Sequence, residues 1–309
     1  MFTATRGRLG ALALVAVGAT VALAGCSSGD PLDSGSSDSG DGSSPTIVIG
    51  SQDYYSNEII AEIYAQALEA NDITVDRQFR IGQREVYIPE IESGSIDLFP
   101  EYTGNLLQFY VPDTTATTSD DVYAALSDAL PEGLRVLDQS PATDQDSYNV
   151  TKAFSDANGV TSLADLAGVS TPLTLGGNSE LATRPYGPEG LKSVYGVDVA
   201  FTPIEDSGGP LTLKALVDDQ VQLVNIYSAD PNIEANDLVT LEDPEGLFLA
   251  SNVVPVVSDK VTDEIADIIN TVSAALTAAD LVSLNGLSVN EQQSADQIAS
   301  DWLAEKALF

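Results

Sequence analysis

The sequence predicts an α/β protein of two lobes, each built on a doubly wound sheet, joined by two chain crossings with a cleft between them. Three observations lead to this prediction. From residue 46 onward, short apolar runs typical of buried strands alternate with segments whose apolar residues recur at helical spacing. The chain has 309 residues, enough for two domains of ordinary size. A last strand and two helices follow the second block, and we expect them to fold back onto the first lobe.

The first block of alternating elements runs from residue 46 to residue 144. Ser56 or Asn57 suits the N-cap of its first helix, because a short polar side chain accepts hydrogen bonds from the free N–H groups there. Pro100 ends its third strand, since proline has no N–H to donate to a sheet. We expect strands at 47–50, 75–81, 96–99 and 134–137, and helices at 57–70, 84–92 and 120–130.

The second block covers residues 145–250, and residues 251–309 are assigned with 46–144 to the first lobe. Pro210 follows Ser207-Gly208-Gly209 and suits the first position of a helix. In the second block we expect strands at 148–153, 173–175, 200–203 and 223–227, and helices at 162–166, 180–195 and 210–218. In the tail we expect a strand at 253–257 and helices at 262–276 and 295–308.

The composition excludes several classes of function. Lys and Arg number 12 against 47 Asp and Glu, a formal net charge of −35, so a nucleic-acid surface is not expected. Histidine is absent and cysteine occurs once, which excludes His-based catalysis, an internal disulfide and a thiolate zinc site. No P-loop or dinucleotide-binding glycine motif is present. We therefore expect no enzyme activity, no cofactor and no metal, and binding becomes the leading class.

The N-terminus has the features of a secretory signal that ends at a lipid-modified cysteine. Arg6 and Arg8 precede an apolar run that closes with Leu23-Ala24-Gly25-Cys26. This closing tetrad resembles the lipobox of bacterial lipoproteins, in which the cysteine receives a diacylglyceryl group and becomes the new N-terminus. Residues 1–25 are thus a predicted signal peptide. Residues 26–45, almost all Ser, Gly and Asp after Cys26, are a predicted flexible tether.

Several segments of the folded part resemble one family, the glycine betaine/choline/carnitine-type (osmoprotectant) substrate-binding lipoproteins of ABC importers. The resemblance spans residues 46–309, and its most specific motif is Glu101-Tyr102-Thr103-Gly104. The other matching segments are Ile49–Glu58, Asp146-Ser147-Tyr148, Arg184–Leu191, Asn225–Asp230 and Asn252–Pro255.

The resemblance implies a two-lobed periplasmic-binding-protein-like fold of type II whose lobes close over a solute. It also implies the partners: a small-molecule solute, and a membrane permease with its ATPase. The protein would be a monomer held by the lipid on Cys26 at the outer face of the cell membrane. A solute-sensing lipoprotein without a transport role is the alternative.

In this family a tyrosine cage holds the quaternary ammonium head of the solute. A trimethylammonium group has no N–H to donate, so aromatic faces rather than hydrogen bonds must bind it. Carried over from the resemblance, the cage residues are Tyr102, Tyr148 and Tyr227. Asp146 lies two residues before Tyr148, on the same face of the expected strand, and would attract the cation.

A zwitterionic solute also needs a partner for its carboxylate. Arg184 falls where the family places a carboxylate-binding arginine, and a planar guanidinium can hold a carboxylate by two hydrogen bonds. Arg84 is the second candidate, unless it forms a surface ion pair with Glu85 or Glu90. Gln52 and Asn105 would donate hydrogen bonds to ligand oxygens. Glu101 is expected to face solvent.

The sequence departs from the family pattern near Ser251-Asn252, where a fourth cage tyrosine would fall and no aromatic residue is present. Either Tyr54, Tyr55 or Tyr186 completes the cage, or the cage is open on one side. The expected ligand is glycine betaine, choline, carnitine or proline betaine. A different small zwitterion, such as ectoine, proline or another amino acid, is the alternative.

Overall fold

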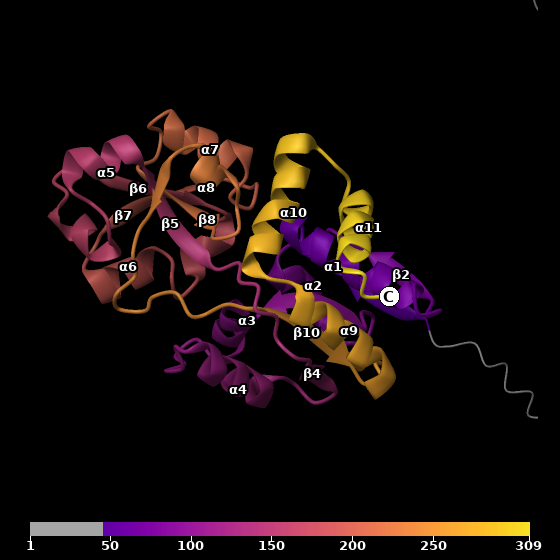
Figure 1. The fold of residues 1–309 in the computed structure, drawn as a ribbon. Coiled ribbons are helices and arrows are strands. Elements are labelled where there is room, and N and C mark those ends of the chain that lie inside the picture. The colour runs from indigo at the N-terminus through magenta and orange to yellow at the C-terminus, as the bar shows by residue number, and fades with distance from the viewer. Residues whose placement is uncertain (1–45) are drawn as a thin grey trace, which may run out of the picture. The chain divides into compact units, whose positions relative to one another are not determined.

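A computed structural model describes residues 46–309, which form two five-stranded sheets with helices packed on them (Figure 1). The prediction of an α/β fold with two lobes is confirmed. The expected signal peptide, the tether and Cys26 lie outside the described residues.

The sheet of lobe 1 has the strand order β2-β1-β3-β10-β4. Strand β1 pairs in parallel with β2 and β3, whereas β10 is antiparallel to both β3 and β4. Since β10 comes from the end of the chain, the tail inserts into the sheet begun by the first block. The strands are β1 (Ile47–Gly50), β2 (Val75–Gln78), β3 (Leu98–Tyr102), β4 (Leu134–Val136) and β10 (Val253–Ser258).

Helix α1 is the centre of the lobe 1 core. Its side chains Ile59, Ile60, Ile63 and Leu68 are at most 1% exposed, because α9, α10 and α11 of the tail pack over it (Figure 1). The helices of this lobe are α1 (Tyr55–Glu69), α2 (Arg84–Glu92), α3 (Thr103–Tyr110), α4 (Ser119–Ala129), α9 (Asp263–Ala275), α10 (Ala278–Glu291) and α11 (Ala295–Lys306).

Lobe 2 repeats the arrangement with the strand order β7-β6-β8-β5-β9. Strand β6 is parallel to β7 and β8, and β5 is antiparallel to β8 and β9. Its strands are β5 (Asp146–Thr151), β6 (Leu173–Gly177), β7 (Val199–Pro203), β8 (Leu223–Tyr227) and β9 (Leu238–Thr240). Its helices are α5 (Lys152–Asn158), η1 (Leu163–Gly168), η2 (Ser179–Thr183), α6 (Pro188–Tyr195), α7 (Pro210–Val217) and α8 (Asn232–Ala235).

Several predicted elements differ from the structure. Pro100 does not end the third strand but lies within β3 (Leu98–Tyr102), opposite Pro255 of β10. The helix expected at 180–195 is two pieces, η2 and α6, because Pro185 and Gly187 interrupt it. The strand expected to reach residue 153 ends at Thr151, whose hydroxyl caps α5. Four helices, α3, α5, α8 and α10, and strand β9 were not expected. Helix α3 begins directly at the end of a strand, and α10 follows α9 after a two-residue break.

The two chain crossings between the lobes run side by side. The N–H of Val253 donates to the carbonyl of Ala142 (3.0 Å), and Thr143 forms an antiparallel bridge with Asn252. Such a two-stranded connection restrains the lobes to rotate about the crossing segments rather than to separate.

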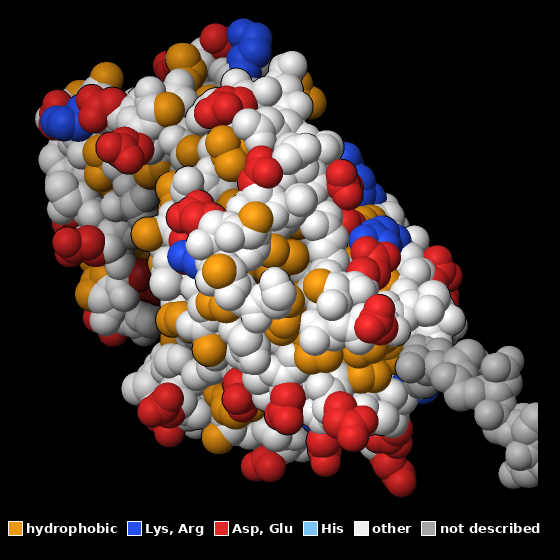
Figure 2. Space-filling model, turned by 45° about the vertical axis from the view of Figure 1, so that its right-hand side comes forward, with side chains coloured by type: hydrophobic (Ala, Val, Ile, Leu, Met, Phe, Trp, Pro, Cys, Tyr) orange, Lys and Arg blue, Asp and Glu red, His pale blue; other side chains and the backbone are white. Residues whose placement is uncertain are grey.

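Acidic side chains are spread over the face of the molecule shown in Figure 2, and Lys and Arg are few, as the net charge of −35 requires. Between residues 46 and 309, no single helix is long and apolar enough to cross a membrane. The bent pair α9 and α10, which meet at 88°, passes that test by length and composition only.

Candidate ligand-binding site

A pocket lies between the lobes, at the ends of strands from both sheets. Gln52 follows β1 and Tyr102 ends β3, while Asn178 follows β6 and Tyr227 ends β8. The carboxyl ends of parallel strands are where open α/β sheets bind ligands. The pocket contains about 530 Å³ of unfilled space, including the part open to solvent. It is lined by Gln52, Tyr54, Gln83, Arg84, Tyr102, Asn105, Asp144, Asp146, Asn178, Glu180, Leu181, Arg184, Tyr186, Asn225 and Tyr227.

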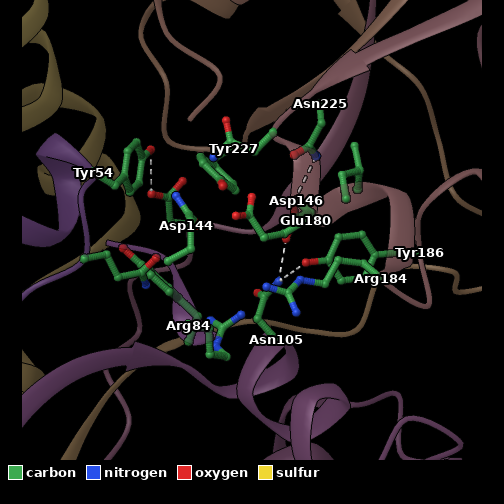
Figure 3. A pocket seen from close by; sticks show the side chains of 15 residues that line it. Tyr54, Arg84, Asn105, Asp144, Asp146, Glu180, Arg184, Tyr186, Asn225 and Tyr227 are labelled. Carbon is green, nitrogen blue, oxygen red and sulfur yellow. Dashed lines mark hydrogen bonds between the residues drawn. The ribbon is translucent and has the colours of Figure 1, made fainter. Parts of the chain in front are cut away.

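Four tyrosines line this pocket: Tyr54 and Tyr102 from lobe 1, and Tyr186 and Tyr227 from lobe 2. The rings of Tyr54 and Tyr227 contact each other across the lobes, with centroids 4.8 Å apart, and Tyr186 lies on the opposite side of the pocket (Figure 3). Burial is the main cause that raises the pKa of all four phenols. Their hydroxyls therefore stay neutral, and the rings offer electron-rich faces.

Tyr148 does not line the pocket, which corrects the expectation that its ring is part of the cage. It is wholly buried, its hydroxyl donates to the carbonyl of Tyr186, and its ring packs edge-on against Phe248 at 5.1 Å. It shares a strand face with Asp146 but lies two residues deeper in β5, beneath the layer formed by Tyr186 and Phe248. Tyr55 also points elsewhere, since its hydroxyl donates to Asp230 (3.0 Å).

Three carboxylates line the pocket. Asp144 accepts hydrogen bonds from the Tyr54 hydroxyl (3.1 Å) and the Ala229 N–H (3.0 Å), and burial raises its pKa from 3.8 to about 7. Asp146 accepts from the side-chain amides of Asn105 and Asn225, and burial raises its pKa as well. The Oε2 atom of Glu180 is buried and has no hydrogen-bond partner among the described residues.

Asn105 connects the two lobes at the position where the aromatic residue is missing. The hydroxyl of Ser251 donates to Asn105 Oδ1 (2.7 Å), which leaves the Nδ2 amine to donate to Asp146 and to the Tyr186 hydroxyl (3.1 Å; Figure 3). The serine thus orients an amide that ties lobe 1 to lobe 2.

Arg84 and Glu101 form a buried ion pair within lobe 1. Both hydrogen bonds between them measure 2.8 Å, and Glu101 also accepts from the Tyr87 hydroxyl (2.5 Å) and the Tyr102 N–H (2.9 Å). The side chain of Glu101 is 0% exposed. The expectation that Glu101 faces solvent is therefore wrong, and Arg84 pairs with it instead of with Glu85 or Glu90.

Arg184 also lines the pocket, and it pairs with a carboxylate of the other lobe. Its two terminal nitrogens donate to the two oxygens of Glu85 at 2.7 and 3.1 Å. The side chain of Glu85 is 49% exposed, and Glu85 does not line the pocket. This ion pair therefore joins the lobes at the rim of the pocket.

Gln52 has an unused donor at the pocket. Its side chain is mostly buried, and its backbone N–H donates to Asn57 Oδ1 (2.8 Å), which fixes the loop after β1. The Nε2 amine is buried without an acceptor in the described part of the chain. A buried donor without a partner is costly, so a ligand oxygen at this place would satisfy it.

The Glu101–Gly104 motif has a structural explanation. Glu101 holds Arg84, and Tyr102 reaches the pocket. Thr103 fastens the start of α3 to the second crossing, because its Oγ1 accepts from the Asn252 N–H (3.0 Å). A Cβ at Gly104 would come within 2.7 Å of the carbonyl oxygen of Ala250, so only glycine lets α3 lie this close to the crossing.

The Arg184–Leu191 segment carries Tyr186 into the pocket on a tight turn. A Cβ on Gly187 would lie 2.0 Å from the carbonyl oxygen of Leu181, which requires glycine there. Pro188 then begins α6 at a position where no N–H is needed.

Sequence reasoning did not assign Asp144, Glu180, Asn178 or Asn225 to the site. A usable signal existed for two of them: Asp144 stands two residues before Asp146, and Asn225 two before Tyr227 on β8, so each is in phase with a predicted residue. Glu180 had no such signal, because it lies in η2, where no strand phase relates it to a predicted residue. Among residues 46–309, no group of three or more metal-ligating side chains could hold a metal ion.

The fold and the pocket together define the class of two-lobed solute-binding proteins. Residues 45–305 match the family model of the substrate-binding domain of ABC-type glycine betaine transport systems. The match covers most of the chain, and the chain belongs to this family. The predictions of the family and of its type of fold are confirmed.

Two curated relatives and one solved structure illustrate the similarity. The glycine betaine-binding protein YehZ of Escherichia coli K12 is 27% identical over 278 residues, which cover 84% of this chain and 90% of the relative. The glycine-betaine-binding protein of Pseudomonas aeruginosa PAO1 is 26% identical, covering 85% of this chain and 89% of that protein. A crystal structure of a glycine betaine/carnitine/choline ABC transporter protein superposes with a TM-score of 0.69 at 19% identity, covering 85% of this chain and 98% of that one.

Membership gives the general role. Proteins of this family bind small solutes outside the cytoplasm and work with an ABC permease and its ATPase, and the family is one of transport proteins rather than of enzymes.

Proposed function

We propose that this chain captures a quaternary-ammonium or related compatible solute, of the type of glycine betaine, choline, carnitine or proline betaine, and delivers it to an ABC permease. The single observation that carries the proposal is the pocket wall: four tyrosines contributed by both lobes stand around one space that also holds three carboxylates. The names of the relatives, both glycine betaine-binding proteins, support the same class of ligand.

The chemistry of the wall suits such a head group. Each aromatic face attracts a cation by about 0.5–2 kcal/mol, more when water is excluded. Tyr54, Tyr102, Tyr186 and Tyr227 act together, so their sum gives useful affinity although each contribution is small. Tyr54 and Tyr186 take the place of the aromatic residue missing near Ser251.

The remaining predicted residues have distinct roles in this proposal. Gln52 donates its free amine to a ligand oxygen, and Asp146 adds Coulombic attraction for the head group. Asn105 closes the lobes over the solute through Asp146 and Tyr186. Arg184 is the candidate partner of a ligand carboxylate where the solute has one, and Tyr148 supports the turn of Tyr186 from behind.

Binding and lobe closure are coupled. Because the pocket wall comes from both lobes, a bound solute contacts both and shifts the population towards the closed arrangement. The closed form then docks on the permease.

The organisation of the whole chain follows from this role. Residues 1–25 are removed as a signal peptide, Cys26 carries the lipid, and residues 26–45 tether a monomeric body at the outer face of the membrane. Lobe 1 comprises 46–144 and 251–309, and lobe 2 comprises 145–250. Metabolic labelling with a tagged fatty acid tests the anchor: wild type takes up label, and Cys26→Ala does not.

Titration calorimetry of residues 46–309 against glycine betaine, choline, carnitine, proline betaine, ectoine and proline tests the ligand class. We expect heat from the quaternary-ammonium compounds and none from proline or ectoine. Binding of only proline, ectoine or another amino acid would contradict the proposal. Uptake by a strain that lacks the gene tests transport: lost uptake supports delivery to a permease, and unchanged uptake would leave a sensing role.

A further inference from the structure

The charges of the pocket are unbalanced once internal ion pairs are taken into account. Its lining holds two guanidinium groups, those of Arg84 and Arg184, and three carboxylates. Each guanidinium is bonded by two nitrogens to a carboxylate outside the lining, Glu101 in one case and Glu85 in the other. Within the described chain, none of the three lining carboxylates forms an ion pair with Lys or Arg. The pocket therefore offers excess negative charge when these carboxylates are ionised.

The unsatisfied polar atoms point to the same kind of ligand. Gln52 Nε2 is a donor without an acceptor, and Glu180 Oε2 is an acceptor without a donor, as far as the described residues go. A hydroxyl group can accept from an amide and donate to a carboxylate. A ligand carboxylate satisfies only the donor and is repelled by Glu180 and by the ionised forms of the two aspartates.

The two arginines differ in how easily each could leave its glutamate partner and bind a carboxylate of the ligand. Glu101 is fully buried and is also held by Tyr87 and the Tyr102 N–H, so Arg84 is fixed. Glu85 is half exposed and bonded to Arg184 alone, and it comes from the opposite lobe. Glu85 is thus the residue that decides whether Arg184 is available.

We infer that the preferred ligand is an organic cation whose second group is a neutral hydroxyl, and that Glu85 sets this preference by holding Arg184 across the lobe interface. The inference rests on the proposed function, whose ligands include both cations and zwitterions. It makes Arg184 a residue that fastens the closed lobes rather than one that clamps a carboxylate.

Choline and glycine betaine form the decisive pair of probes, because they share the trimethylammonium head and differ by hydroxymethyl against carboxylate. By titration calorimetry, wild type is expected to bind choline at least about tenfold more tightly. In Glu85→Gln, which frees Arg184, the ratio of the two dissociation constants should move towards glycine betaine by about tenfold.

Two matched variants separate this effect from simpler ones. Asp53→Asn removes another exposed carboxylate, paired with Arg80 beside the pocket, and controls for net charge. Tyr55→Phe removes the hydroxyl that donates the inter-lobe hydrogen bond to Asp230 and controls for loosened closure without a change of charge. Both should change the affinities for the two probes in parallel and leave their ratio unchanged.

The outcomes are distinct. Tighter binding of choline, with a ratio that moves only in Glu85→Gln, supports the inference. Equal or tighter binding of glycine betaine by wild type overturns it while the proposed function stands, and so does a ratio that is the same in wild type and Glu85→Gln. Binding of neither probe overturns this inference, and the proposed function falls with it if carnitine and proline betaine are not bound either.

Discussion

Both arginines at the pocket pair with a glutamate through two hydrogen bonds, but one glutamate is buried and the other is exposed. The Arg84–Glu101 pair lies inside lobe 1, with the carboxylate 0% exposed and two further donors on it. The Arg184–Glu85 pair joins the two lobes at the rim, with a carboxylate that is 49% exposed. Water competes for the second pair and not for the first.

The difference shows that the role of a bidentate ion pair depends on whether it lies within a lobe or between lobes. The buried pair lies within lobe 1 and orients the end of β3, and hence Tyr102. The rim pair joins residues of different lobes, so in the proposed closure it would stabilise the contact between the lobes and not the folding of either one.

The largest expected effect comes from breaking the buried pair. Glu101→Gln leaves the guanidinium of Arg84 buried beside a neutral amide, and we expect the free energy of unfolding to fall by about 3–5 kcal/mol. Urea titration followed by circular dichroism measures it. A loss below about 1 kcal/mol would mean that the buried pair resembles the exposed one, and the comparison would fail.

The second-largest effect is expected when a tyrosine side chain that lines the pocket is removed from either lobe. Tyr102→Ala beside the buried pair and Tyr227→Ala in the opposite lobe should each weaken binding of a quaternary ammonium by about 1–2 kcal/mol. Calorimetry measures the loss, and Tyr102→Phe and Tyr227→Phe keep the aromatic face and should bind almost as wild type does. If only the lobe 1 variant lost affinity, the two walls would not form one site.

The pH dependence concerns Asp144, which lies on the first crossing between the lobes. Its pKa is raised by burial from 3.8 to about 7, and its neighbours are the Tyr54 hydroxyl, the Ala229 N–H and Asp230. A raised acid pKa means that the folded state holds the proton more tightly than the unfolded state, so this group makes stability fall as the pH rises from 3.8 to about 7. A bound cation has the opposite preference and favours the ionised form.

Affinity for a cation should therefore decrease by up to about tenfold between pH 8 and pH 6, as Asp144 takes up its proton. Calorimetry at a series of pH values measures this, and in Asp144→Asn the profile should be flat over that range. A flat profile for wild type would show that Asp144 does not sense the charge of the ligand.

The smallest expected effect is that of the rim pair on folding. Glu85→Gln should change the free energy of unfolding by less than about 1 kcal/mol, because the carboxylate is exposed and belongs to an interface that unfolding of either lobe does not require. Urea titration beside Glu101→Gln gives the direct comparison. Equal losses in the two variants would remove the distinction between a structural and a conformational pair.

Much of the fold could be predicted from the sequence because its elements are locally determined. The bounds of α2 and β8 agree with those expected from the apolar pattern. For helix α3, which the pattern did not predict, the deciding contacts are distant in the chain. Helix α3 begins at the very end of β3 because Thr103 and Gly104 pack against the second crossing, and nothing local marks that boundary.

The candidate site was likewise predicted in part, and the prediction failed where contacts between distant segments decide. Six of the seven ligand-binding residues predicted from the resemblance, namely Gln52, Tyr102, Asn105, Asp146, Arg184 and Tyr227, lie together around the pocket, and Tyr148 does not. Strand phase places Asp146 and Tyr148 on one face but does not tell which of them reaches the edge of the sheet. That depends on Tyr186 and Phe248, which come from other segments and cover Tyr148.

The order of residues in the chain was enough to give the class of the protein, because the alternation of strands and helices, the absence of histidine and the tyrosine-bearing motifs can all be seen in the sequence. The partners of the charged groups, in contrast, depend on the tertiary structure. Arg84 is one residue from Glu85 but pairs with Glu101, and Glu85 pairs with Arg184 of the other lobe. Ion pairs form between groups that folding brings within a few ångströms, and sequence separation says little about that distance.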